Sequence, residues 1–386
     1  MVLIQMILDQ FAQEAHCKRI AALAVELGRR AGIDAQALTQ AALLHDSLDA
    51  LGDSTGLGRL AWQVVAGDQA DCAAGIVRVC HFVDERMEGL EFEYQDIDSI
   101  LEEIRSFSVF EHFDPALIDH LNGLRHRVQP HAWELPAEGR VAGDVFRTLR
   151  GRAEFEPGEL ESLALRDPAL TASLLGVANS ALFGRATPVA TVARAVSCLG
   201  VEAARKVMLA VAMRPLFASA GLARVWSHSV KSAPLCAALA ERTGLLSREE
   251  GLVLGLVHDI GAVAVQALPV EVMATCQNLI AGGCPQVYVE RLLLGKDHGE
   301  IGAALLAEWH FPDELIEAVR LHHQPERSES KLVSLAYLAE FWSGQEEDLP
   351  SFGRVETALD RTGSTMEVLA ELGGNDSTLH ALHSVA

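Results

Sequence analysis

The sequence predicts an all-α protein, and three observations lead to this prediction. Hydrophobic residues make up 49% of the 386 residues but aromatic residues only 5%, and the abundant Ala and Leu favour helix over sheet. Apolar residues recur at helical spacing, as Ile20, Leu23, Ala24 and Leu27 do on one face. No segment has the apolar–polar alternation between hairpin turns that is typical of strands.

The first helices are expected from an internal repeat. Residues 16–46 and residues 228–259 each begin with a His, continue through an amphipathic helix containing A-L-A, break at a Gly and close on His-Asp. The two histidines are 29 residues apart in the first copy and 30 in the second. Two antiparallel helices of this length bring both ends together, so each copy gathers two imidazoles and a carboxylate.

The later helices have recognisable start signals. Asp167-Pro168 places a capping residue before a proline at the first helical position. In the second repeat copy we expect a helix from His228, a turn near Gly244 and a returning helix that ends at His258-Asp259. A helix that follows His298 and a helix capped by Asp313 come next, and the second of these carries His322 and His323 at its C-terminal end.

Polar or Pro- and Gly-containing breaks near residues 125–140, 184–188 and 344–352 suggest the domain organisation. We expect a helical domain over residues 1–130 and a second over residues 131–345, which divides into subdomains 131–220 and 221–345. A C-terminal tail follows over residues 346–386.

Composition excludes several classes of partner. The net charge of −22 disfavours unspecific binding to nucleic acids and docking on anionic membranes. No stretch approaches the ~20 apolar residues of a membrane span, and the N-terminus lacks the basic region of a signal peptide. The seven cysteines include no C-x-x-C, which argues against a disulfide framework or a thiolate zinc site. We therefore expect a cytoplasmic protein with no nucleic-acid or membrane partner.

The second half carries a candidate metal site of imidazoles and carboxylate. Its residues are His228, His258, Asp259, His298, His322 and His323. Such a ligand set suits divalent Fe, Mn, Zn or Ni. The alternative is a set of core polar groups that hydrogen-bond one another.

Six separated motifs in this half resemble the HDOD domain family of bacterial signalling proteins, over about residues 134 to 342. They are L-R-D-P-A-L-T-A-S-L-L-G-V-A-N-S-A-L-F-G, A-R-A-V-S-C-L-G-V-E-A-A-R, W-S-H-S-V, L-V-H-D-I-G, H-G-E-I-G-A-A-L-L-A-E-W and L-H-H. HDOD domains are relatives of the HD and HD-GYP phosphohydrolases. The resemblance implies an all-helical fold and a regulatory, non-catalytic role. We interpret the signature residues Asp167, Asn179, Ser180 and Gly184 as capping and turn residues.

The N-terminal repeat copy resembles a degenerate HD or HD-GYP domain, with Cys80 where the family has a His. The resemblance implies a second, weaker set of metal ligands, which comprises His16, His45, Asp46 and Asp98. A structural remnant that only packs the domain is the alternative. His81 is expected to lie on the surface or in a loop.

The C-terminal copy departs from the active HD enzymes at their last ligand, an Asp. Tyr337 stands about where that Asp would be, and a phenol with a pKa of ~10 does not replace it; Glu300 or Glu340 is an alternative carboxylate.

Two functions follow. The favoured one is a non-catalytic signal-transduction protein that binds a signalling partner or a small nucleotide-like ligand, with a homodimer left open. The other is a metal-dependent phosphohydrolase acting on a nucleotide or cyclic dinucleotide, with Lys296 or Arg320 neutralising charge.

Overall fold

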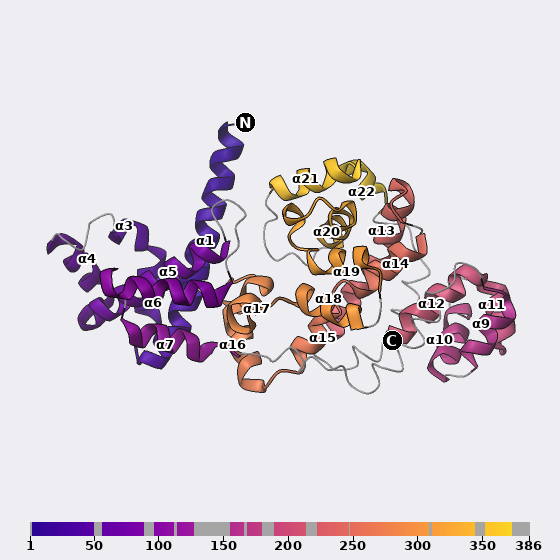
Figure 1. Cartoon of the computed structure of the whole chain (residues 1–386), viewed down its shortest axis with the longest axis horizontal. Coiled ribbons are helices and arrows are strands. Elements are labelled where there is room, and N and C mark those ends of the chain that lie inside the picture. The colour runs from indigo at the N-terminus through magenta and orange to yellow at the C-terminus, as the bar shows by residue number, and fades with distance from the viewer. Residues whose placement is uncertain are drawn as a thin grey trace. The chain divides into compact units, whose positions relative to one another are not determined.

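The computed structural model contains only helices as regular elements in the residues that it describes, so the all-α prediction is confirmed there (Figure 1). The described residues are 2–49, 56–88, 96–111, 114–126, 155–165, 168–179, 189–213, 222–246, 248–308, 311–343 and 352–372. None of their helices is long and apolar enough to cross a membrane. All seven cysteines lie among the described residues, and none of them is in a disulfide bond.

The contacts within the chain define two compact units. One comprises residues 1–129 together with 268–297, and the other comprises residues 130–267 together with 298–386. A domain boundary at about residue 130 remains a prediction, but residues 268–297 lie with the N-terminal helices and not with the rest of region 131–345.

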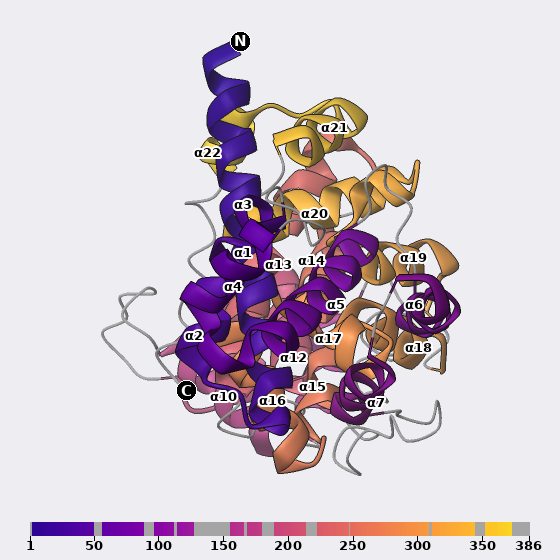
Figure 2. The ribbon, with the colours of Figure 1, turned by 90° about the vertical axis from the view of Figure 1, so that its left-hand side faces the viewer.

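The N-terminal unit is built around its first helix, α1, which contacts α2, α5, α7 and α16 (Figure 2). Its helices are α1 (Val2–Ala31), α2 (Ala35–Leu43), α3 (His45–Asp49), α4 (Gly56–Ala66), α5 (Ala70–Glu88), α6 (Ile97–Glu111), α7 (Pro115–Leu124), α16 (Val270–Ala281) and α17 (Gln286–Leu294).

Close packing explains why residues 268–297 join this unit. A Cβ atom on Gly282 would lie 2.6 Å from Cβ of Ala22, so the end of α16 reaches α1 because that position has no side chain. Beyond it, the Cys284 thiol donates to the carbonyl oxygen of Arg19 at 3.8 Å. The Arg19 guanidinium lies 5.8 Å from the centre of the Tyr288 ring.

The second unit contains twelve described α-helices. They are α9 (Pro157–Ala164), α10 (Pro168–Ala178), α11 (Val192–Leu199), α12 (Val201–Met213), α13 (Ala223–Thr243), α14 (Arg248–Val257), α15 (Gly261–Gln266), α18 (His298–Glu308), α19 (Asp313–Arg320), α20 (Lys331–Ser343), α21 (Phe352–Thr362) and α22 (Met366–Leu372).

The predicted hairpin over residues 228–259 forms from α13 and α14. Gly244 ends α13 with a φ of 68°, the left-handed conformation that favours glycine at this position. A Cβ atom on Gly255 would lie 2.5 Å from Cα of Ala233. The two helices therefore pack backbone against backbone and hold their histidine ends in register.

The region expected to be only a polar tail contains two further helices. Helix α21 packs on α20, and α22 contacts α13. Val355, Ala358 and Leu369 are buried there, and Arg361 donates to two backbone carbonyl oxygens, those of Pro325 and Ser328, at 2.6 Å each. Apolar burial thus extends the unit to residue 372.

Asn179 has the turn role that we expect from its sequence context, whereas Asp167, Ser180 and Gly184 lie outside the described residues. The Asn179 side-chain amide donates to the carbonyl oxygen of Val189 at 2.9 Å, and Asn179 Oδ1 accepts from the Val189 N–H at 2.6 Å. One side chain therefore joins two backbone positions ten residues apart.

Asn179→Asp is expected to destabilise the protein by about 1–2 kcal/mol, because the variant loses the donor and sets a carboxylate against a carbonyl oxygen. Denaturant unfolding of the full chain measures the change. Asn278→Asp is the control, since Asn278 is exposed on α16 and the substitution adds the same charge; equal midpoints for the two variants would contradict the role of Asn179.

Candidate metal centre

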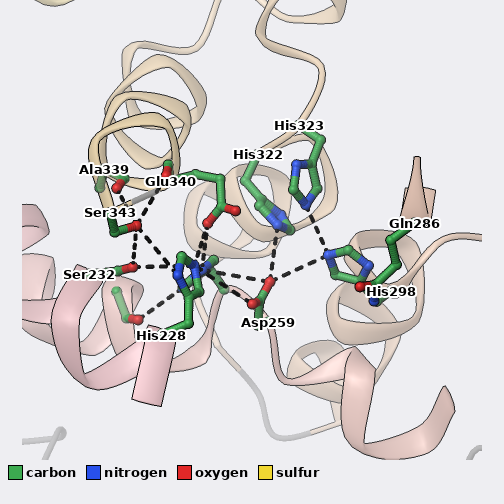
Figure 3. Close-up of polar contacts among 12 residues, drawn as sticks. His228, Ser232, Asp259, Gln286, His298, His322, His323, Ala339, Glu340 and Ser343 are labelled. Atoms are coloured by element: carbon green, nitrogen blue, oxygen red, sulfur yellow. Dashed lines mark hydrogen bonds and ion pairs between the residues drawn. The ribbon is translucent and has the colours of Figure 1, made fainter. Parts of the chain in front are cut away.

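The second unit brings all six C-terminal candidate residues together, from four places in its fold (Figure 3). His228 comes from α13, and His258-Asp259 follows α14. His298 opens α18, and His322 and His323 follow α19. A seventh residue, Glu340 of α20, completes the cluster.

The first ligand group comprises His228, His258, Asp259 and Glu340, all of them buried. Glu340 Oε2 lies 2.5 Å from His228 Nε2 and 3.1 Å from His258 Nε2. The two imidazole Nε2 atoms are 3.0 Å apart. Asp259 Oδ1 is 3.6 Å from His258 Nε2.

The second ligand group comprises Asp259, His298, His322 and His323. Asp259 Oδ1 lies 3.3 Å from His298 Nε2 and 3.4 Å from His322 Nε2. His298 Nε2 and His323 Nε2 are 2.9 Å apart. In each group the four ligand atoms lie within 4.8 Å of one another, and Asp259 belongs to both groups.

Backbone carbonyls fix the orientation of two of these rings. His258 Nδ1 donates to the carbonyl oxygen of Gly255 at 2.9 Å, and His322 Nδ1 donates to that of Val319 at 2.6 Å. These carbonyls belong to the last turns of α14 and α19, where helices leave acceptors free. In the neutral rings, Nε2 therefore carries a lone pair directed into the cluster, as in histidines that ligate metals.

The electrostatics favour two ionised carboxylates. Burial acts to raise the pKa of Asp259, but the charge of His258 and the neighbouring rings of His298 and His322 hold it well below its usual value. Burial likewise opposes ionisation of Glu340, and its hydrogen bonds with His228 and His258 hold its pKa well below the usual value.

The pKa values of two imidazoles in the cluster shift in opposite directions. Burial acts to lower the pKa of His258, but the charge of Asp259 and the contact with Glu340 raise it to about 9. Burial and the neighbouring His322 and His298 rings hold the pKa of His323 well below its usual value. The cluster therefore combines two negative charges with a His258 ring that favours the protonated form and a His323 ring that favours the neutral form.

These residues fit divalent metal ions. Asp259 Oδ1 and His322 Nε2 are buried, and neither has a hydrogen-bond partner among the described residues. Unpaired buried polar atoms are costly, and a cation would satisfy the oxygen and the nitrogen lone pair together. Imidazole nitrogens with carboxylate oxygens are a ligand set for Zn, Fe, Mn or Ni.

Glu340 supplies the carboxylate that we do not find at position 337 in the sequence. Tyr337 lies fully buried on α20, and Glu340 follows it by three residues, which places it on the same face of the helix. The proposed charge-neutralising residues Lys296 and Arg320 are both exposed, in contrast to the buried cluster.

The N-terminal set is only partly assembled. His16, His45 and Asp46 converge with one another and with His81. Asp98 is not in this group; at the start of α6 it pairs with Arg125 Nη1 at 2.6 Å. Asp98 does not take part because Ile97 and Ile100 occupy the buried face of α6.

His81 takes the place that we expect for Asp98. It lies in the middle of α5, its side chain is 30% exposed, and its Nδ1 lies 3.1 Å from His45 Nε2. Burial lowers the pKa of His81; Glu85 acts in the opposite direction, and His45 and His16 lower the pKa further. The expectation of a surface or loop histidine is therefore wrong for this residue.

Comparisons with known proteins agree with the motifs. Residues 135–325 match the HDOD domain. A protein of Treponema pallidum (strain Nichols), named only as uncharacterized, is 25% identical over 194 residues, which are 48% of this chain and 37% of that protein. The match thus spans little more than a third of the relative's length.

Two solved structures share the fold at lower identity. A candidate phosphohydrolase from Shewanella amazonensis SB2B is 24% identical with a TM-score of 0.51, over 64% of this chain and 92% of that one. A candidate signal transduction protein from Marinobacter aquaeolei VT8 is 19% identical with a TM-score of 0.50, over 67% and 61%. On the match of residues 135–325, this part of the chain is an HDOD domain.

Proposed function

We propose that the protein is a cytoplasmic regulatory protein whose HDOD domain holds two divalent metal ions and binds a small ligand that carries a phosphate group. The observation that carries this proposal is the position of Asp259, which is a member of both ligand groups. A carboxylate between two ligand groups suits a pair of ions, and paired ions polarise phosphoryl oxygens when bound.

The charge of the centre supports an anionic ligand. Asp259 and Glu340 contribute two negative charges, and an imidazole that ligates a metal ion does so in its neutral form. Two divalent ions would carry four positive charges, so the filled centre would be cationic inside a chain with a net charge of −22. A phosphate group at this site would meet the opposite charge, although the acidic surface disfavours a polyanion such as nucleic acid.

The enclosure of the cluster supports binding over turnover. Of its seven residues, only His323 is partly exposed; the other six are buried. A ligand would therefore reach the centre from the side of His323. A buried site that admits little solvent suits recognition and a conformational response by the helices that carry the ligands.

Hydrolysis of the same ligand is the second candidate function, and the position of Glu340 favours it. The missing last carboxylate is the argument from sequence against turnover, and Glu340 Oε2 lies 3.1 Å or less from two histidines of the first group. The name of the Shewanella amazonensis relative, a candidate phosphohydrolase, agrees with this alternative.

The test is binding of a nucleoside monophosphate to the metal-loaded full chain by calorimetry, beside hydrolysis of bis(p-nitrophenyl) phosphate. We expect binding that disappears when a chelator removes the metal, with no release of p-nitrophenolate above that of free metal. Hydrolysis that His258→Ala abolishes would replace the regulatory proposal by the enzymatic one. Absence of both metal and binding would reject both.

Each of the two ligand groups is expected to lose its metal ion independently of the other. Glu340→Gln is expected to remove one metal ion per chain and to leave the other, because Glu340 belongs to the first group alone; His323→Ala is expected to do the same to the second group. Elemental analysis after dialysis measures the metal content. Loss of both ions from either variant, with circular dichroism unchanged, would contradict a centre made of two groups.

A further inference from the structure

A second cluster of histidines lies in the N-terminal unit, outside the centre described above. His16 of α1, His45 and Asp46 of α3 and His81 of α5 each place one ligand atom within 4.8 Å of the others. The three ring centroids are 5.3, 5.1 and 4.9 Å apart. Side chains from three helices thus converge on one point.

The His16 ring is held from its outer side. His16 Nδ1 lies 2.7 Å from Asp84 Oδ2, and the ion pair that Asp84 forms with Arg19 Nε at 2.8 Å fixes this carboxylate. The Arg19 guanidinium donates to both oxygens of Asp84, from Nε at 2.8 Å and from Nη2 at 2.9 Å, which is the geometry of an ionised carboxylate. An ionised carboxylate only accepts, so Nδ1 carries the hydrogen and Nε2 of the neutral ring keeps its lone pair.

The other two rings are oriented in the same way. His45 Nδ1 donates to the carbonyl oxygen of Ala42 at 2.8 Å, which leaves the lone pair on Nε2. His81 Nε2 lies 3.3 Å from the Glu85 carboxylate, which favours a hydrogen on Nε2 and a lone pair on Nδ1. Yet His45 Nε2 and His81 Nδ1 are only 3.1 Å apart, and two lone pairs at that distance repel unless a cation lies between them.

Asp46 completes the set. Gln13 donates a short hydrogen bond to Asp46 Oδ2, while Asp46 Oδ1 lies 2.9 Å from His45 Nε2. The Asp46 side chain is 52% exposed and that of His81 30% exposed, so an ion can enter from solvent. Three imidazoles and one carboxylate are four ligands, the number that zinc takes in closed structural sites.

We propose that His16, His45, Asp46 and His81 bind one zinc-class divalent ion, and that Asp84 is a positioning residue for His16. The site joins α1, α3 and α5, so the ion acts as a structural clamp. With all four positions filled by protein ligands, it has no open position for a substrate. This proposal is independent of the function proposed for the HDOD domain, because it shares no residue with that centre.

The experiment measures zinc content and the melting temperature of the full chain, with and without added Zn²⁺. Asp46→Asn and His81→Ala are each expected to lower the zinc content by one ion per chain, relative to the wild type. In an Asp259→Asn background, which is expected to remove both ions of the other centre, Zn²⁺ is expected to raise the melting temperature by about 5 °C. Adding Asp46→Asn to that background removes this rise.

His126→Ala is the matched control, because His126 lies in the same unit and outside the cluster. Asp46 is exposed, so Asp46→Asn is expected to keep the fold even where a histidine variant loses it. The proposal fails when Asp46→Asn and His81→Ala bind as much zinc as His126→Ala. It fails equally when the rise in melting temperature survives Asp46→Asn.

The role of Asp84 as a positioning residue for His16 is tested by the zinc affinity of a separate variant. Asp84→Asn keeps the shape of the side chain but loses the charge, and we expect the zinc affinity of the N-terminal site to fall about 10- to 100-fold, with one ion still bound at saturation. Unchanged affinity in a folded variant would remove Asp84 from the proposal without affecting the four ligands.

Discussion

Asp259→Asn is expected to remove both metal ions of the HDOD domain. The Asp259 carboxylate lies between the two ligand groups, 3.6 Å from His258 Nε2 and 3.3 Å from His298 Nε2. Because the amide carries no charge, neither group retains the bridging anion. We expect the affinity for each ion to fall by more than about 100-fold, beyond the usual loss for a residue that only supports a ligand.

The measurement is the number of ions per chain after dialysis. Asp360→Asn is the control for the loss of one negative charge, since Asp360 is exposed on α21 of the same unit. Zinc in the N-terminal unit is unaffected by either variant, so a decrease of two ions, and not three, is the expected result. An Asp259→Asn protein that keeps one ion would show that one group binds without the shared carboxylate.

Replacing Asp259 is also expected to lower the stability of the metal-free protein. It removes one of two carboxylates beside the buried His258 ring, whose pKa is raised to about 9, and leaves Glu340 3.1 Å away. Because the charge of the ring stays partly compensated, the loss is expected to stay below the cost of about 3 kcal/mol for a fully broken buried ion pair. Circular dichroism at 25 °C therefore accompanies the metal analysis, and only folded samples are compared.

The C-terminal cluster could be predicted from the sequence because the spacing of its histidines follows helix geometry. His228 and His258 are separated by one helix, a glycine turn and a returning helix, and the structure places their Nε2 atoms 3.0 Å apart. The motifs around His298 and His322 contributed the remaining histidines. What the sequence did not decide was the last carboxylate, because Tyr337 holds the expected position and Glu340 lies one turn later.

The N-terminal cluster was harder to predict. His81 lies on an otherwise amphipathic helix, with Cys80 buried beside it, and no start or stop signal distinguishes it from a surface histidine. The available signal was Asp84, a carboxylate in register with the apolar face of Val77, Cys80 and Met87. A buried acid at such a position requires a partner, and its partners are His16 and Arg19.

Local sequence patterns did not predict which residues belong to each of the two units. Residues 268–297 follow α15 in the chain but pack on α1. Their contact depends on a missing side chain at Gly282 and on small residues in the middle of α1. Helical periodicity identifies which face of a helix is buried, but it does not identify which distant helix covers that face.

Gly261→Ala is expected to have the largest effect on stability, through the crossing of α15 and α18. A Cβ atom on Gly261 would lie 1.9 Å from the carbonyl oxygen of His298 and 2.6 Å from the amide nitrogen of Gly302. Both are backbone atoms, so neither can turn aside and the helices must separate. We expect a loss of about 3 kcal/mol, at the upper end of the usual cost of overpacking.

The same displacement would affect the metal centre. His298 opens α18, and moving its backbone takes its Nε2 away from Asp259 and His323, now 3.3 and 2.9 Å distant. Gly261→Ala is therefore expected to lose the ion of the second group while the first group keeps its own. Urea unfolding and elemental analysis of the same samples measure both effects.

Two other glycines of the unit provide graded controls. A Cβ atom on Gly302 would meet nothing closer than 3.2 Å, so Gly302→Ala is expected to cost less than Gly261→Ala. Gly158, exposed in α9, has no atom within 4 Å of such a Cβ, and Gly158→Ala is expected to be neutral or to stabilise by up to about 1 kcal/mol. If Gly261→Ala unfolds at the same urea concentration as Gly158→Ala and keeps its metal, α15 and α18 do not cross as closely as described, and the position of His298 in the centre is wrong with them.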